Sequence, residues 1–175
     1  MSKQIPISFE FFPTKTDAGA EKLITVHKEL QLLNPEFFSV TYGAGGSTRE
    51  RTLSTLNDFN GKGTPVAPHL SCIGDSKERI AELLDLYKSQ GIDRIVALRG
   101  DLPSGQVGLG ELPYAQDLVR FIREHSGDHF QIEVAAYPEM HPQAESFDKD
   151  IQRFCEKVRV GANAAITQFF FNPDA

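Results

Sequence analysis

The chain has 175 residues, of which 40% are hydrophobic and 24% are charged, and its formal net charge is −6 at pH 7. This length fits one domain with a well-buried core, and the negative charge argues against a general nucleic-acid binder, which would present a basic face. No apolar run reaches the roughly 20 residues that span a bilayer, and the two cysteines fit neither a metal motif nor a disulfide framework, so we expect a cytoplasmic protein without nucleic-acid or membrane partners.

Six short apolar runs are predicted as strands, at residues 5–9, 37–40, 66–68, 94–98, 131–135 and 164–167. Their centres recur about every thirty residues, which is the length of a strand–helix unit with its return loop. The stretches between them have helical periodicity. The clearest has apolar side chains at i, i+3, i+4 and i+7, namely Ile80, Leu83, Leu84 and Tyr87.

Strict alternation of strands and helices predicts a parallel sheet covered by helices. A doubly wound open sheet and a TIM-type (β/α)8 barrel both satisfy this pattern. A dinucleotide-binding open sheet would usually carry G-x-G-x-x-G after its first strand, whereas Phe11, Phe12 and Pro13 stand there. The segment 43–47 is glycine-rich but lacks that spacing, and a flexible turn explains it equally well.

Polar side chains follow every predicted strand at its carboxyl end, where the active site of a parallel barrel lies. A single polar residue there is usually a hydrogen-bonded structural residue, but six in register favour a functional site. These residues are Glu10, then Thr41 and Tyr42, His69, Arg99 with Gly100 and Asp101, Tyr137 and Gln168.

Glu10 stands between Phe9 and Phe11 in the sequence. A carboxyl group surrounded by aromatic rings loses hydration, which raises its pKa and suits a general acid near neutral pH. The alternative is that Glu10 forms a salt bridge with a lysine or arginine of the barrel.

Two further groups of residues have both a functional and a structural interpretation. Arg99 can meet a phosphate with its planar fork, Gly100 permits close backbone approach and Asp101 can accept hydrogen bonds from ring N–H groups; the alternative is a surface turn. On the fifth predicted helix, Arg153 and Lys157 share a face with Asp150, which is either a solvated ion-paired face or a pyrophosphate site. Its opposite face is predicted to point into the core, with Ile151, Phe154, Cys155 and Val158.

Two other chemistries lack their residues at these strand ends. A Schiff-base aldolase needs a lysine there, and none of the six ends has one. A metal hydrolase needs clustered histidine and carboxylate ligands, but no H-x-H or H-E-x-x-H spacing occurs. A metal-free site rich in aromatic and hydrogen-bonding groups remains, and it suits a planar heterocyclic ligand.

The chain resembles the methylenetetrahydrofolate reductase family in six short motifs, which occur in family order from about residue 5 to the last residue. They are SFEFFP at 8–13, SVTYGA at 39–44, APHL at 67–70, ALRGDLP at 97–103, AAYPEMHP at 135–142 and ITQFFF at 166–171. Each motif is short, but the combination is highly specific.

The resemblance implies a TIM barrel that carries FAD, is reduced by NADH or NADPH, and then reduces 5,10-methylenetetrahydrofolate to 5-methyltetrahydrofolate in a ping-pong reaction of one-carbon metabolism and methionine biosynthesis. It implies that Glu10 is the general acid, that Asp101 is catalytic and lies beside both flavin and pterin, and that Gln168 contacts the folate. The residues it implies for FAD binding are Thr41, Tyr42, Ala44, His69, Arg99, Gly100, Asp101, Ala115, Tyr137, His141, Ala144, Asp150, Arg153 and Lys157. No metal is implied, and the intact family enzyme is expected to be a homo-oligomer.

A (β/α)8 barrel takes about 250 residues. We therefore expect residues 1–175 to form a single catalytic barrel domain that is truncated after its sixth strand. Two other functions stay open on the sequence: another cofactor-using barrel enzyme, and a non-catalytic barrel that binds a partner.

Overall fold

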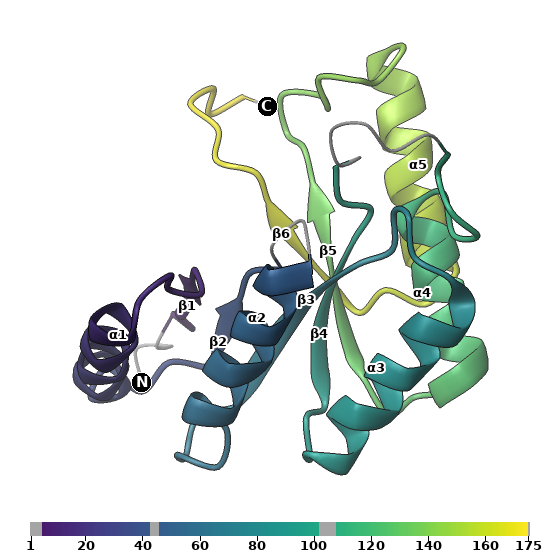
Figure 1. Ribbon diagram of the computed structural model, residues 1–175. Helices are drawn as coiled ribbons and strands as arrows, with labels where there is room; N and C mark the ends of the chain where they lie inside the picture. The colour runs from purple at the N-terminus through teal and green to yellow at the C-terminus, as the bar shows by residue number, and fades with distance from the viewer. Residues whose placement is uncertain (1–4, 43–45, 102–107, 175) are drawn as a thin grey trace.

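The computed structural model describes residues 5–42, 46–101 and 108–174, and strands and helices alternate through them (Figure 1). The elements are β1 (Ser8–Phe11), α1 (Asp17–Gln31), β2 (Phe37–Val40), α2 (Gly46–Phe59), β3 (Val66–Ser71), α3 (Lys77–Ser89), β4 (Arg94–Leu98), α4 (Ala115–Ser126), β5 (Gln131–Ala136), α5 (Phe147–Arg159) and β6 (Ala164–Thr167). None of the described helices is long and apolar enough to cross a membrane.

The described strands form one sheet in the order β1-β2-β3-β4-β5-β6, and every neighbouring pair is parallel. The sheet curls into part of a barrel, with the helices between the strands (Figure 1). This arrangement confirms the predicted fold, a TIM-type barrel of which the chain supplies six strand–helix units. Because all strands run the same way, their carboxyl ends lie at one edge.

Three strands differ from their predicted bounds, and the fifth differs only by ending at Ala136 instead of residue 135. The first strand is Ser8–Phe11 rather than residues 5–9, because β2 provides hydrogen-bonding partners only opposite that stretch. The third strand continues past Pro68 to Ser71. Pro68 lacks an N–H, but it stands where pairing with β2 ends and pairing with β4 begins at His69, so the strand passes through it.

The main core lies between the outer face of the sheet and the helices. Phe38, Ile95 and Val134 contribute from the strands. On α3 the four apolar side chains predicted from the helical period are all buried: Ile80, Leu83, Leu84 and Tyr87. Ser76 begins this helix by accepting a hydrogen bond from the Arg79 backbone N–H at 3.3 Å.

The prediction that α5 points an apolar face into the core is confirmed only for Phe154, which is partly buried and packs against the core. No residue of this helix is fully buried, and Ile151 and Val158 are each 49% exposed. Helix α5 packs against α4 and lies beside the end of β5, while β6 is an edge strand whose residues are all exposed. In the described structure no further strand or helix covers that side, so the apolar face of α5 is only half-covered.

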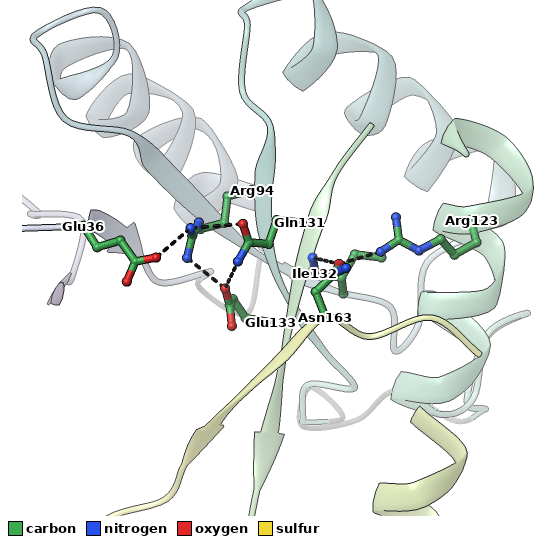
Figure 2. A network of polar contacts seen from close by, with 7 residues as sticks. All are labelled: Glu36, Arg94, Arg123, Gln131, Ile132, Glu133 and Asn163. Carbon is green, nitrogen blue, oxygen red and sulfur yellow. Dashed lines mark hydrogen bonds and ion pairs between the residues drawn. The ribbon is translucent and has the colours of Figure 1, made fainter. Parts of the chain in front are cut away.

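Polar groups fill the inner face of the sheet near its amino-terminal edge (Figure 2). Arg94 begins β4, stacks its guanidinium 4.4 Å from the Phe37 ring centre and contacts the carboxylates of Glu36 and Glu133. Its Nη2 also donates to Gln131 Oε1 at 3.1 Å. Three strands and the loop before β2 are therefore joined by one side chain.

A second arginine joins α4 to the loop before β6 (Figure 2). Arg123 donates to the carbonyl oxygens of Gly161 and Phe130 and to Oδ1 of Asn163, at 2.6–3.0 Å. The same Asn163 oxygen accepts from the Ile132 backbone N–H at 2.8 Å. This network fixes the end of α5 and the start of β6 against the rest of the sheet.

Candidate functional site

The carboxyl edge of β4, β5 and β6 carries a cavity of about 480 Å³. Asp101, Tyr137 and Gln168 line it, although they are up to 67 positions apart in the sequence (168 minus 101). Met140 and Phe169 add apolar surface to its wall. The prediction that these strand ends converge in space is therefore confirmed.

A neighbouring cavity of about 450 Å³ extends between β4, β5 and the helices α4 and α5. Most of the residues implied for FAD binding line it: Arg99, Gly100, Asp101, Ala115, Tyr137, His141, Asp150, Arg153 and Lys157. The two cavities share Arg99, Asp101, Tyr137, His141 and Gln143. They are thus two compartments of one mouth, with Asp101 on the boundary.

The cavity between α4 and α5 has a cationic wall. Lys157 donates to the Ala135 carbonyl oxygen, and burial lowers the pKa of its ammonium group. Arg153 Nη2 lies 3.4 Å from Glu145 Oε1 and is 43% exposed at the side chain. Both cations come from the same face of α5, at i and i+4, so the helix presents two positive charges toward the cavity.

The loop after β5 is held by its own polar groups. The backbone N–H of His141 donates to Asp150 Oδ2 at 2.8 Å, and His141 Nδ1 accepts from the Gln143 backbone N–H at 3.0 Å. The Tyr137 ring meets the His141 ring edge-on at 4.4 Å, and burial raises the pKa of the Tyr137 hydroxyl. Asp150 therefore orders the loop as well as lining the cavity.

Gln143 was missed by the sequence analysis. Its Oε1 accepts from Arg99 Nη2 at 2.8 Å, and its side chain lines both cavities. The only sequence signal was its position in the loop after a strand, since a glutamine carries no motif of its own. It fixes the Arg99 guanidinium at the mouth.

Gly100 is required where β4 turns into the mouth. Its φ is +82°, and a Cβ built there would lie 1.8 Å from Ser71 Oγ. Ser71 Oγ in turn donates to the Arg99 carbonyl oxygen at 2.9 Å. The end of β4 is thus packed against the end of β3 so closely that only glycine fits.

The expected environment of Glu10 is wrong. Successive strand residues point to opposite faces, so Phe9 and Phe11 pack on the helix side with Phe38, while the Glu10 side chain is 47% exposed. Its pKa is lowered, not raised, chiefly because the His69 side chain stabilises the carboxylate, and the opposing effect of burial is smaller. Its ionic partner is a histidine, rather than the lysine or arginine of the alternative prediction.

Glu10 and His69 come from β1 and β3, with β2 between them. Nε2 of His69 lies 3.3 Å from Oε2 of Glu10, and the histidine side chain is only 9% exposed. Nε2 has no well-aligned hydrogen-bond partner among the described residues. The pair is therefore a close polar contact rather than a well-formed hydrogen bond.

The remaining predicted residues lie around these groups. The Thr41 backbone pairs with Phe11, its N–H donating to that carbonyl oxygen at 2.9 Å, and Tyr42 follows it, half-buried. The Ala144 N–H donates to the His141 carbonyl oxygen in the loop after β5, outside the lining of both cavities. Ala44 lies outside the described residues.

Comparison with known proteins gives a consistent result. The methylenetetrahydrofolate reductase family profile matches residues 1–175. The chain is 46% identical over 173 residues to 5,10-methylenetetrahydrofolate reductase of Pectobacterium carotovorum subsp. carotovorum, covering 98% of this chain and 57% of that protein. It is 39% identical over 181 residues to methylenetetrahydrofolate reductase (NADH) 1 of Zea mays, covering 95% of this chain and 30% of that one.

Solved structures with a similar fold are much more distant in sequence. A phosphonopyruvate hydrolase, solved with oxalate and Mg²⁺, superposes with a TM-score of 0.64 at 11% identity, over 94% of this chain and 58% of that one. Such a likeness shows the barrel fold alone. The family profile and the close relatives agree over nearly the whole sequence, and from them we conclude that the chain belongs to the methylenetetrahydrofolate reductase family.

Proposed function

We propose that the protein containing this chain reduces 5,10-methylenetetrahydrofolate to 5-methyltetrahydrofolate, with FAD as resident cofactor and a reduced nicotinamide as electron donor. The chain spans 57% of the length of its Pectobacterium relative, so the activity belongs to the whole protein. The observation that carries the proposal is the pair of adjoining cavities with Asp101 on their boundary. Hydride transfer in two steps through one carrier needs such adjoining sites.

The cavity between α4 and α5 suits FAD by its chemistry. Lys157, Arg153 and Arg99 supply cations for a pyrophosphate. Tyr137 supplies an aromatic surface, and Gly100 allows close approach of the backbone. When bound there, FAD would supply the two-electron chemistry that amino-acid side chains lack.

The cavity beside β6 suits the pterin of the folate. Asp101 and Gln168 offer acceptor and donor groups that match the N–H and C=O groups of a pterin ring. Met140 and Phe169 offer apolar surface for its flat faces. The nicotinamide is proposed to use the same compartment before the folate enters, since both must reach the boundary at Asp101.

Glu10 is proposed as the general acid. The methylene bridge of the folate joins two nitrogens, and one C–N bond must break before the carbon can accept a hydride. Protonation of the departing nitrogen lets it keep the bonding electron pair. Reduction of a flavin by a nicotinamide needs no such proton donor to the substrate.

The test of Glu10 uses Glu10→Gln in the full-length protein, with each half-reaction followed by stopped-flow absorbance. Loss of a general acid costs about 10²–10⁴-fold in rate, so folate reduction should collapse while flavin reduction stays within about tenfold of the parent. Equal slowing of both half-reactions would mean that Glu10 positions the cofactor or supports the fold instead.

The cofactor is tested by the visible spectrum of the full-length protein. We expect flavin bands that bleach with NADH or NADPH in the absence of oxygen and return when 5,10-methylenetetrahydrofolate is added. The name of the maize relative favours NADH, and parallel titrations with the two nicotinamides decide between them. Failure of the purified protein to take up FAD would defeat the proposal. Sedimentation of the same sample tests the predicted homo-oligomer.

A further inference from the structure

His69 has no role in the reaction proposed above beyond its expected place beside the cofactor. It lies in the interior of β3, it is 7% exposed, and Nε2 is sealed from solvent and aimed at Glu10. Glu10 is half-exposed near the carboxyl end of β1. A buried, titratable nitrogen therefore stands directly behind the carboxyl group that is proposed to donate a proton.

The Glu10–His69 pair is separated from the other charged groups on the inner face of the sheet. On the inner face, β2 presents Ser39 at the register of Glu10, and β4 presents Val96 at the register of His69. Beyond Val96, the Glu133 carboxylate is already bonded to Arg94 at 2.9 Å. The titratable groups that line the cavity beside β6 are Arg99, Asp101, Tyr137, Glu139 and His141. Among the described residues, no other cationic nitrogen lies within 4.0 Å of the Glu10 carboxylate.

A lone carboxyl with the environment of Glu10 is a poor proton donor at neutral pH. His69 lowers its pKa from the ordinary value, so the carboxylate form dominates. An acid that must donate a proton then needs a neighbour that holds one in reserve. An imidazole can hold a proton and release it again, which is what such a reserve requires.

We propose that His69 is the proton reservoir of Glu10, so that the two side chains hold one transferable proton between them and act together as the general acid. When Glu10 gives its proton to the departing folate nitrogen, the C–N bonding electrons stay on that nitrogen and the carboxyl becomes a carboxylate. That proton reaches Oε2 of Glu10 beforehand from Nε2 of His69, which is left as the neutral imidazole, and afterwards the half-exposed carboxylate takes a new proton from solvent and returns it to Nε2. His69 is a positioning and relay residue, and this inference rests on the proposed function of Glu10.

The pair and the lone acid differ in their pH dependence. When the pair shares one proton, the fraction of molecules in which Glu10 carries that proton does not change with pH until the pair loses the proton altogether. In a lone carboxyl, the protonated fraction falls tenfold for each pH unit above its pKa. The pH range above the ordinary pKa of a carboxyl, about 4.3, separates the two cases.

The experiment measures folate reduction by the pre-reduced full-length protein between pH 5 and 6.5, in the parent and in His69→Gln. Glutamine keeps an N–H near Glu10 but cannot titrate. The parent rate should change less than about threefold over this range, and the His69→Gln rate should fall about 30-fold. His69→Asn is a smaller second substitution, and His125→Gln, which removes a histidine on α4 that pairs with Asp85, should follow the parent.

A second readout does not involve turnover. In ¹³C NMR titrations of the cofactor-free protein, with Glu10→Gln to assign the resonance, the Glu10 carboxyl should titrate at higher pH in His69→Gln than in the parent. Identical pH profiles of the parent and both His69 variants would overturn the reservoir, as would an unmoved Glu10 titration. Full folate reduction by Glu10→Gln would instead defeat the acid role of Glu10 itself, so the two failures are distinguishable.

Discussion

The guanidinium of Arg94 lies 2.9 Å from the carboxylate of Glu133, Nη1 to Oε1, inside the curled sheet. The two side chains come from neighbouring strands and are 12% and 4% exposed. Burial raises the pKa of Glu133, against the attraction of Arg94, which lowers it. Arg94 therefore stabilises the charged form of the buried Glu133 carboxylate.

Replacing Arg94 with Met should destabilise the fold strongly, because it leaves a buried carboxylate without its partner. We expect a loss of about 3–5 kcal/mol in the free energy of unfolding at pH 7, measured by urea denaturation. Arg79→Met removes an exposed arginine that lies 3.8 Å from Asp75, and it should cost less than about 1 kcal/mol. Equal effects would mean that the buried pair contributes no more than a surface one.

The cost of Arg94→Met should also depend on pH. A carboxyl whose folded pKa is raised above its unfolded value favours the folded state when protonated, and that contribution is lost as pH rises through the folded pKa. Without Arg94 the pKa of Glu133 rises further, so the variant should lose stability more steeply than the parent between pH 4 and 7. Parallel stability curves for the two proteins would contradict this account.

Arg123 offers a test of the network that joins α4 to the loop before β6. Arg123→Met removes charge-assisted hydrogen bonds to three carbonyl oxygens and to Asn163, and it should lower the free energy of unfolding by about 2–4 kcal/mol. Arg120→Met is the matched control on the same helix, since Arg120 is 50% exposed and pairs only with Asp117 among the described residues. We expect the control to cost about 0.5 kcal/mol. Thermal unfolding of both variants compares them.

His27 lies buried on α1 against the rings of Phe38 and Phe59, at 4.4 and 4.1 Å. Neither ring nitrogen has a partner among the described residues, and burial lowers the pKa of the imidazole. A lowered histidine pKa means that the unfolded chain binds protons first, so stability is lost as pH falls below about 6.5.

His27→Phe should therefore stabilise the fold, by about 1–2 kcal/mol at pH 5 and by less at pH 8. Denaturation at the two pH values measures the difference. A variant that is less stable than the parent at pH 5 would show that the phenylalanine ring does not fit, or that His27 has a polar partner.

Gly91 provides a control for testing the close packing of the backbone at Gly100. Both have positive φ, +82° and +72°, but a Cβ at Gly91 meets open space whereas a Cβ at Gly100 collides with Ser71 Oγ. Gly91→Ala should cost about 1–2 kcal/mol from backbone strain alone. Gly100→Ala should cost more, and in the full-length protein it should also weaken FAD binding, measured by flavin fluorescence titration. Unchanged FAD affinity would remove Gly100 from the proposed cofactor site.

Much of this architecture could be predicted from the sequence. Strands β2, β4 and β6 have the predicted bounds, and the apolar period of residues 80–87 identified the buried face of α3. These features depend on local periodicity and on steric preferences of the backbone, which each segment carries by itself. The convergence of Asp101, Tyr137 and Gln168 could also be predicted, because parallel strands place their carboxyl ends at one edge.

Only the tertiary structure decided which side chains meet across strands. The sequence placed Glu10 among aromatic residues. Because side chains alternate along β1, Phe9 and Phe11 point to the opposite face of the sheet from Glu10. The neighbour of the Glu10 carboxylate is instead His69, which comes from β3, two strands away. The sequence also predicted an apolar core-facing side of α5, of which Phe154 packs against the core whereas Ile151 and Val158 stay half-exposed. Burial and pKa depend on contacts between residues far apart in the chain, and no local pattern records which of those contacts form.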